Sequence, residues 1–391
     1  HPLTVKLQRV SDRIYATNPS LPRETIVYTY RSSIPNAISF GEGTVCVMLG
    51  LLERLATEDQ LAYVLCHELA HYHAHHADRH FGQLATLNYD KELKHKINAI
   101  KNNVYGRYAQ LKALFNDLEI SVTKHSRKSE FEADSLGLVY YLKTGYDRAA
   151  PVQVMQILGK ADRGLNQYNI EFRKHFDFKD LPFKESWTTF SSHDLVYASL
   201  THEVPDTLRT HTNTKRRADR LKEMRGIRET EGQPPGKVEG FIRLASLEII
   251  NSHYHFGEYG KALFRSLLLS DSLPQHPYPH AMVAKSLYQL YKAQKDHHLD
   301  RALELPDPRF DENYNRFLSF IGKLRLHELA SLCYEYATNQ RPEFYTDEEF
   351  IHALWLCSRF NFSKVDPEKI LQEYEDLFPK GKYLTEMKRK K

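Results

Sequence analysis

The sequence has 391 residues, of which 41% are hydrophobic and 27% are charged. These proportions are those of a folded globular protein, and the length exceeds what one hydrophobic core usually serves, so we expect two or three domains. The 54 Lys and Arg residues nearly balance the 50 Asp and Glu residues, and a formal net charge of +4 disfavours a nucleic-acid partner. Because the sequence contains no run of about 18 apolar residues, it predicts no membrane-spanning segment.

The first 200 residues combine a strand-like stretch with several helical ones. Residues 25–48 alternate apolar and polar side chains, which predicts two or three short strands in a small sheet. Residues 57–60, Thr-Glu-Asp-Gln, have the form of a capping box and predict a helix from about residue 58 to residue 80. Further helices are predicted at 90–118 (a helix or hairpin), at 129–144 and from about residue 150. Residues 163–200 are aromatic, Lys-rich and irregular, which predicts a long loop with short helical turns.

The second half of the chain is predicted to be a separate helical domain. Residues 226–240 are rich in Gly and Pro and have the composition of a linker. The pattern Gly257-x-Tyr-x-x-Ala-Leu, with Pro274 after it, matches the second half of a tetratricopeptide repeat (TPR). We therefore predict an all-α, TPR-like domain over 241–391, with ordinary helical packing as the alternative.

An H-E-x-x-H motif is formed by His67, Glu68 and His71. A spacing of four places both imidazoles on one helix face, about one turn apart, where they can share a metal beside the Glu68 carboxylate. A catalytic zinc takes three protein ligands and keeps one position open for water. A Gly three residues after the second His and another His at six residues would indicate a metzincin, but these positions hold Ala74 and Ala77. The third ligand must therefore come from elsewhere in the chain.

The best candidates for that ligand are the carboxylates of Glu130 and Asp134. They are four residues apart in Glu-Phe-Glu-Ala-Asp and would share one face of a helix. We predict that Glu130 binds the metal and that Asp134 holds a ligand histidine by its second ring nitrogen. For this segment taken alone, a solvated acidic turn is the alternative.

At these residues the sequence resembles the gluzincin metallopeptidases of family M48, which include the CAAX prenyl protease, HtpX and the soluble BepA-type enzymes. The resemblance also includes residues 35–68 and the Ser-Arg-x-x-Glu-x-x-Ala-Asp element that begins at Ser126, and it spans roughly 25 to 225. It implies an α+β, predominantly helical fold, with a zincin-like peptidase domain over 1–225 that contains a small sheet. The helices after the linker are similar in arrangement to those of BepA-type proteins.

The resemblance also implies the chemistry. One Zn²⁺ per chain, held by His67, His71 and Glu130, would polarise the scissile carbonyl, and Glu68 would act as general base. His211, with Arg217 six residues later, is similar to the family's His-Pro…Arg segment, although Thr stands where Pro is usual. Either residue is expected to stabilise the oxyanion, or His211 caps the metal as a fourth ligand and keeps the enzyme idle.

A substrate strand is implied as well. The edge strand formed by Asn36, Ala37, Ile38, Ser39 and Phe40 is expected to pair with an extended substrate through backbone hydrogen bonds. Such pairing tolerates many sequences but requires unfolded chain. The predicted function is a zinc endopeptidase that hydrolyses unfolded or misassembled proteins in envelope quality control, with a further protein partner on the TPR-like domain.

The alternative is a peptidase-inactive chaperone or scaffold that acts through the TPR-like domain. Because the chain begins with His1 and resembles BepA-type enzymes, we expect an extracytoplasmic, periplasmic location with an N-terminal signal or anchor removed.

The remaining His and Cys residues have simpler interpretations. The other four histidines near the motif, at positions 73, 75, 76 and 80, are expected on the helix surface. The four cysteines are expected to be buried small hydrophobes, with a bridge between Cys333 and Cys357 on neighbouring helices as the alternative.

Overall fold

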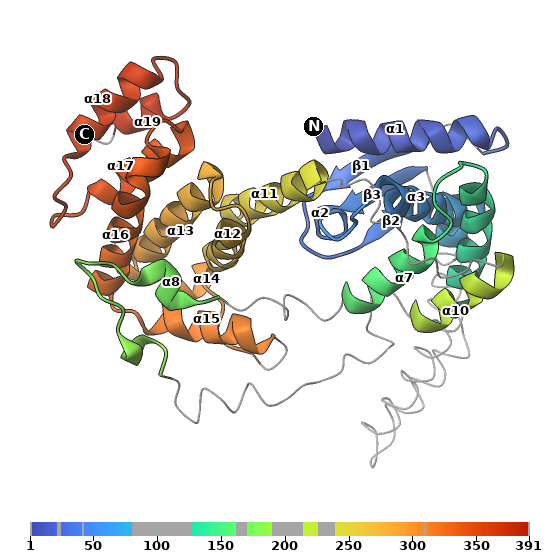
Figure 1. The fold of residues 1–391 in the computed structure, drawn as a ribbon, viewed down its shortest axis with the longest axis horizontal. Coiled ribbons are helices and arrows are strands. Elements are labelled where there is room, and N and C mark those ends of the chain that lie inside the picture. The colour runs from blue at the N-terminus through green and yellow to red at the C-terminus, as the bar shows by residue number, and fades with distance from the viewer. Residues whose placement is uncertain are drawn as a thin grey trace, which may run out of the picture. The chain divides into compact units, whose positions relative to one another are not determined.

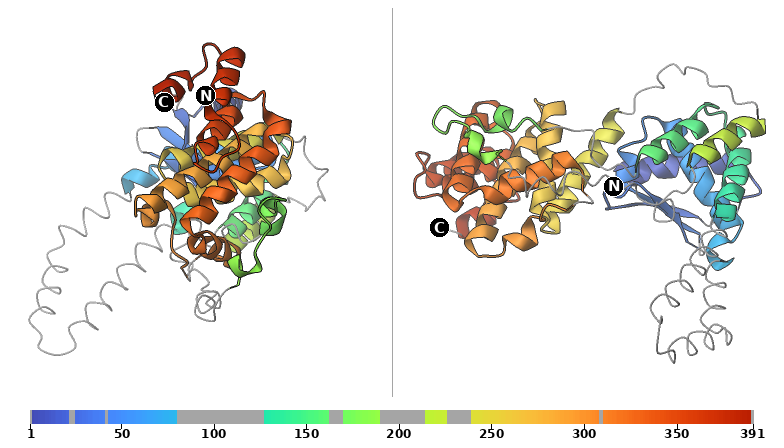
Figure 2. Two further views of the ribbon diagram at one scale, coloured as in Figure 1. Left: turned by 90° about the vertical axis from the view of Figure 1, so that its left-hand side faces the viewer. Right: turned by 90° about the horizontal axis from the view of Figure 1, so that it is seen from below.

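The computed structural model describes residues 2–21, 25–40, 43–79, 127–161, 170–189, 214–225, 239–307 and 310–389. These residues form two compact units (Figures 1 and 2). The first contains the described residues up to 161 together with 214–225 and 239–245, and the second contains 170–189 and everything described from 246 onward. The predicted helix at 90–118 and residues 226–238 of the predicted linker lie outside the described residues.

A three-stranded sheet lies in the first unit, as the alternation over 25–48 predicts. Its strands are β1 (Ile26–Tyr30), β2 (Ala37–Ser39) and β3 (Thr44–Met48), in the order β1-β3-β2. Strand β3 runs parallel to β1 and antiparallel to β2. Alternate side chains such as Val45 and Val47 are completely buried, so one face of the sheet belongs to the core.

Two helices pack against this sheet. Helix α1 (Pro2–Thr17) contacts β1, and helix α3 (Glu58–His73) contacts β2 and β3 (Figure 1). The sequence analysis made no prediction for α1, although its apolar residues follow helical spacing and are buried, at Leu3, Leu7, Val10 and Ile14. The short helix α2 (Leu49–Leu52) connects β3 to the segment before α3, and a Cβ atom at Gly50 would lie 2.1 Å from the Ser33 carbonyl oxygen. Only glycine allows the chain before β2 to approach α2 this closely.

Helix α3 begins where the capping box predicts and ends earlier than predicted. The Thr57 side chain accepts a hydrogen bond from the Gln60 backbone N–H at 3.1 Å and caps the first turn. The predicted helix to residue 80 stops at His73, because His75 has a left-handed backbone conformation with φ of 52°. Residues 76–79 are helical again.

The helix at 127–142 packs against α3 at very short distance. A Cβ atom at Gly137 would lie 3.0 Å from His67 Cα and 3.1 Å from the Cys66 carbonyl oxygen, so the two helix backbones nearly touch there. Helix α7 (Ala150–Ala161) then packs against both α3 and α10 (Thr214–Arg225). The predicted helices over 129–144 and from residue 150 are thus confirmed.

All regular elements described in the second unit are helical, and the first of its longer helices, α11, begins in residues 239–245 of the first unit. Its elements are α8 (Phe172–Phe176), the 3₁₀ turn η1 (Glu185–Trp187), α11 (Glu239–His255), α12 (Tyr259–Ser272), α13 (Pro277–Lys295), α14 (Leu299–Ala302), α15 (Glu312–Lys323), α16 (Leu326–Phe344), α17 (Glu348–Ser358), α18 (Pro367–Leu377) and α19 (Leu384–Arg389). Helix α13 is central and contacts α12, α16 and α17. Gly257, with φ of 78°, lies in the turn that separates α11 from α12, whereas the TPR itself stays a prediction.

One segment falls in a different unit from the one that composition indicated. Residues 170–189, which the predicted boundaries place in the 1–225 domain, pack with the second unit. The rings of Phe172, Phe176 and Trp187 lie 4.7–6.3 Å from that of Phe320 on α15. An irregular aromatic stretch has no periodicity that would indicate which core it joins.

Two cysteines lie side by side on α16 and α17. Cys333 and Cys357 are both buried free thiols, with their sulfur atoms 2.8 Å apart. Together with Cys66 they are buried thiols, as the sequence analysis predicts, whereas Cys46 is only partly buried.

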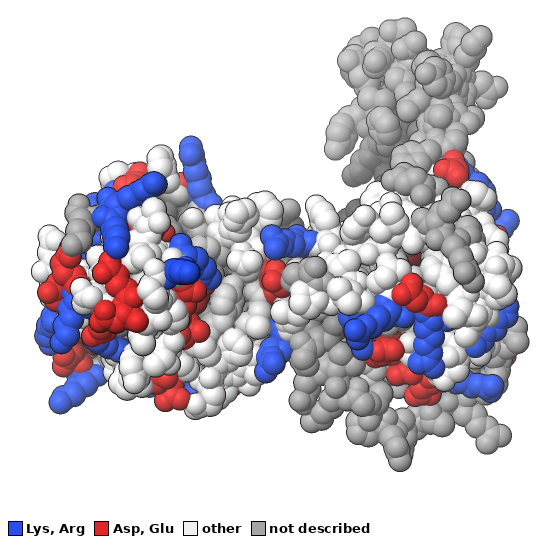
Figure 3. Space-filling view, turned by 90° about the horizontal axis from the view of Figure 1, so that it is seen from above, with Lys and Arg blue, Asp and Glu red and all other residues white. Residues whose placement is uncertain are grey.

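The surface agrees with the balanced composition. On the face shown in Figure 3, Lys and Arg side chains are interspersed with Asp and Glu over the described residues. No helix among the described residues is long and apolar enough to cross a membrane.

Candidate metal and catalytic site

His67 and His71 face the same point from consecutive turns of α3. Their Nε2 atoms are 3.1 Å apart, and both side chains are largely buried. This arrangement follows from helix geometry alone, because residues four apart lie on one face of a helix.

Glu130 reaches the same point from the helix at 127–142. Its Oε1 lies 3.3 Å from His71 Nε2 and its Oε2 lies 3.7 Å from His67 Nε2. Ligand atoms about 2.0–2.1 Å from a tetrahedral zinc lie about 3.3 Å from one another. The spacings of His71 Nε2 to His67 Nε2 and to Glu130 Oε1 are close to this value, whereas His67 is nearer to the other Glu130 oxygen and at a longer distance. Within the described parts of the chain, these residues form the one group of three such side chains that could share a metal.

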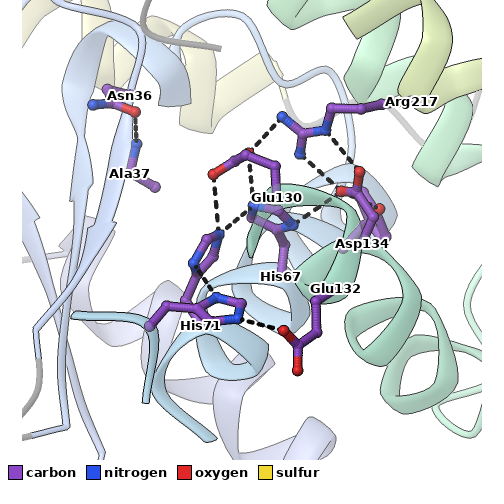
Figure 4. Close-up of polar contacts among 10 residues, drawn as sticks. Asn36, Ala37, His67, His71, Glu130, Glu132, Asp134 and Arg217 are labelled. Carbon is purple, nitrogen blue, oxygen red and sulfur yellow. Dashed lines mark hydrogen bonds and ion pairs between the residues drawn. The ribbon is translucent and has the colours of Figure 1, made fainter. Parts of the chain in front are cut away.

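Asp134 and Arg217 lie next to these ligands, on the right in Figure 4. Asp134 Oδ1 is 3.1 Å from Nδ1 of His67, the second ring nitrogen, which is the contact that the sequence analysis predicts. Arg217, on α10, donates from Nε and Nη2 to the two Asp134 oxygens at 2.7 and 2.8 Å, and its Nη1 lies 2.6 Å from Glu130 Oε2. Tyr63 donates a further hydrogen bond to Asp134 at 3.3 Å. One buried arginine therefore connects both carboxylates of the site.

The electrostatics keep these carboxylates ionised. Burial disfavours the charged form of Asp134, but the nearby guanidinium of Arg217 outweighs it and lowers the pKa of Asp134 to about 2. Burial also opposes ionisation of Glu130, yet Arg217 and the two ligand histidines lower the pKa of Glu130 well below its ordinary value. Both groups are thus in the form that can bind a metal or hold its ligands.

Glu68 is buried next to the ligand set, with 7% of its surface exposed. Burial lowers the pKa of His71, whereas the contact with Glu130 and the negative charges of Glu130 and Glu68 raise it by more. Glu68 is therefore close enough to the metal ligands to act on them electrostatically. That proximity is what a general base in an H-E-x-x-H site requires.

The predicted substrate strand forms one edge of the sheet. Backbone hydrogen bonds join Asn36 and Phe40 to β3, so residues 37 and 39 between them present their main chains away from β3. The Ala37 N–H donates to Asn36 Oδ1 at 2.9 Å (Figure 4). Helix α3 contacts β2, which places this edge next to the helix that carries both ligand histidines.

The sequence analysis places the other histidines near the motif on the helix surface, and this is correct for His73, whereas His75 is exposed but lies past the end of α3. His80 lies outside the described residues, as does the predicted catalytic residue His211. His76 is buried, with 6% of its surface exposed, and its Nδ1 lies 2.8 Å from the Nδ1 of the ligand His71. No signal in the sequence indicates this contact, because in an unbroken helix a residue five positions on lies on another face.

The side chain of Arg217, which was predicted to stabilise the oxyanion, faces the two carboxylates of the site. Its side chain is 1% exposed and its nitrogens face Asp134 and Glu130. Stabilisation of the oxyanion stays a prediction for His211. Arg217 instead pairs with the carboxylates of Asp134 and Glu130.

The model of peptidase family M48 matches residues 3–225, which include every site residue named above. The chain belongs to peptidase family M48. The mitochondrial metalloendopeptidase OMA1 of Schizosaccharomyces pombe is 28% identical over 162 residues, which are 41% of this chain and 46% of that protein. The match thus spans about half the length of that relative. This M48 chain is a member of a zinc metalloendopeptidase family, and His67, His71 and Glu130 are its candidate metal ligands.

Proposed function

We propose that this chain is an active endopeptidase that hydrolyses unfolded or misassembled proteins and carries one zinc ion. The observation that supports this most directly is the convergence of His67, His71 and Glu130, whose ligand atoms lie within 4.8 Å of one another. Nothing in the packing of α3 alone would bring an acidic side chain from another helix to two imidazoles. Ion binding gives a reason for all three.

The chain's own residues have distinct tasks in this proposal. A zinc ion held by the three ligands supplies Lewis-acid activation of the scissile carbonyl and of a water molecule. Glu68 takes the proton of the attacking water and returns it to the leaving amine. Asp134 orients His67 through its outer ring nitrogen, and Arg217 fixes the Asp134 and Glu130 carboxylates without facing the substrate.

The proposed substrate class rests on the outer edge of β2, which pairs with no second strand among the described residues. An extended peptide that runs alongside the strand would pair with the main chain of Ser39 and the Ala37 carbonyl, which point away from β3, while the Ala37 N–H already donates to Asn36 Oδ1. Main-chain pairing does not select side chains and is open only to segments that are free of other secondary structure. We therefore include a quality-control role in the proposal, whereas the extracytoplasmic location and a partner for the TPR-like domain stay predictions.

The test uses the full chain, with Glu68→Gln as the decisive variant and Glu223→Gln, at an exposed position on α10, as its control. Zinc content is measured together with cleavage of α-lactalbumin in its native form and in its reduced, carboxymethylated, unfolded form. We expect one zinc per chain in all three proteins. Cleavage of the unfolded form should be abolished by a chelator and should fall by about 100-fold or more in Glu68→Gln alone.

Two results would contradict the proposal. Equal cleavage of native and unfolded substrate would remove the assigned substrate class. A wild-type chain that binds zinc but cleaves neither form, and that behaves like Glu68→Gln, would favour the peptidase-inactive scaffold instead.

A further inference from the structure

A second buried histidine lies directly behind the metal ligand His71. The Nδ1 atoms of His76 and His71 are 2.8 Å apart, and the ring centroids are 4.7 Å apart with the planes at 76°. On its other side, His76 Nε2 lies 3.2 Å from Glu132 Oε2. The two rings and the carboxylate therefore form a continuous chain of polar contacts that leads outward from the candidate metal centre.

The backbone is shaped to make this chain. His75 has a φ of 52°, a left-handed conformation that costs a residue with a Cβ atom about 1 kcal/mol or more. This conformation ends α3 and turns the chain, so that His76 lies against His71 instead of continuing along the helix. Strain of this kind is retained where the surrounding structure uses it.

Glu132 comes from the same helix as the ligand Glu130. Its carboxylate also accepts a hydrogen bond from Arg79 Nη2 at 3.2 Å, which holds it in place although its side chain is 40% exposed. One helix thus supplies both the third metal ligand and the outer end of the chain behind His71.

The contacts determine where the ring protons lie. Because Nε2 of His71 faces the other ligand atoms, its lone pair is needed there and its proton is on Nδ1. That N–H can donate only if His76 Nδ1 accepts, and His76 then carries its own proton on Nε2, which donates to Glu132. Nδ1 of His67 lies 3.1 Å from Asp134 Oδ1, so each ligand imidazole has a polar atom that can accept a proton-mediated contact close to its outer nitrogen.

We propose that His76 and Glu132 form an imidazole–carboxylate relay that holds His71 in its metal-binding tautomer and orientation. The relay rests on the metal site of the proposed function. His76 and Glu132 are positioning residues in this relay, because both act through His71 and neither is a candidate metal ligand.

The test measures zinc affinity, by competition with a chromophoric chelator, and the visible absorption spectrum of the Co²⁺-loaded full chain. His76→Phe keeps the ring volume but removes the acceptor, and we expect a 10- to 100-fold weaker affinity and a changed Co²⁺ spectrum. His76→Asn places an amide oxygen near the former Nδ1 and should recover much of the loss. His73→Phe is the control, because this exposed imidazole contacts Tyr140 and not the ligands, and should leave zinc affinity within about twofold.

A second pair of variants addresses the outer end of the relay. Glu132→Leu removes the acceptor of His76 at a position where the side chain is 40% exposed, and should weaken zinc binding about two- to tenfold, whereas Glu132→Gln should lose less. Melting temperatures of the metal-free proteins separate stability from positioning. A purely structural His76 would lower the metal-free melting temperature of His76→Phe and His76→Asn alike, with no difference between their zinc affinities.

The relay is overturned if His76→Phe and Glu132→Leu bind zinc as tightly as wild type, or if His76→Asn is no better than His76→Phe. Should His76→Phe fail to fold, the two Glu132 variants decide by themselves. A wild-type chain that binds no zinc would instead refute the proposed function, so the two failures are distinguishable.

Discussion

Replacing Arg217 with methionine should destabilise the first unit by about 3–5 kcal/mol in the metal-free protein. Methionine keeps most of the side-chain length but removes the charge that faces both Asp134 and Glu130. A pKa of about 2 for Asp134, against an ordinary value of 3.8, corresponds to about 2.5 kcal/mol of favourable interaction in the folded state. Without Arg217, the desolvation of both buried carboxylates is no longer offset, which brings the expected loss to the stated range.

The assay can report the two units separately. Both tryptophans, Trp187 and Trp355, lie in the second unit, so their fluorescence during urea unfolding follows that unit and should not change. Hydrogen exchange of the α3 amides, measured by mass spectrometry across the same urea series with chelator present, follows the first unit. Arg216→Met is the matched control, since this neighbour on α10 is exposed, and should change stability by less than about 0.5 kcal/mol.

The loss of stability in the Arg217→Met variant, relative to the wild type, should also depend on pH in a defined direction. In the wild type the pKa of Asp134 is lowered, so its contribution is complete above pH 3.8 and is lost only as the pH falls toward about 2. In the variant, Arg217 no longer opposes the effect of burial, so we expect the pKa of Asp134 to rise and its protonation between pH 7 and pH 4 to relieve the buried charge. The difference between the two proteins should therefore shrink as the pH falls from 7 to 4. A loss below about 1 kcal/mol at pH 7, or a deficit that grows on acidification, would refute this account of the ion pairs.

Two further predictions concern packing and a second buried ion pair. Gly137→Ala should lower the stability of the first unit by about 1–2 kcal/mol and weaken zinc binding, because its methyl group would push the helix at 127–142, which carries Glu130, away from α3. The control Gly322→Ala, at an exposed helical position with space around it, should be neutral or stabilising. Equal effects of the two substitutions on stability would contradict the close approach of the helices. Lys285→Met removes the buried partner of Glu349 between α13 and α17 and should destabilise the second unit by about 3 kcal/mol, measured as a lower urea midpoint of tryptophan fluorescence. The control Lys292→Met, at an exposed position, should leave the midpoint unchanged. Similar midpoints for the two variants would show that the ion pair is dispensable.

Local sequence signals were sufficient to predict much of the first unit, which carries the candidate metal site. The four-residue spacing of His67 and His71 places both rings on one helix face in any α-helix, and the Thr57 cap determines where that helix begins. The same rule puts Glu130 and Asp134 on one face of a second helix. Each of these features depends on neighbours within about four residues, which is the range over which a sequence pattern is informative.

Only the tertiary structure shows how the pieces meet. The pairing of Arg217 with two carboxylates more than 80 residues away, the β1-β3-β2 strand order and the inclusion of 170–189 in the second core depend on contacts between distant segments. His76 is the clearest case, because its contact with His71 requires a left-handed backbone at His75, where no glycine marks the turn. The sequence by itself thus determined which side chains can bind a metal, whereas long-range packing decided which groups support them, since packing brings together residues that share no local pattern.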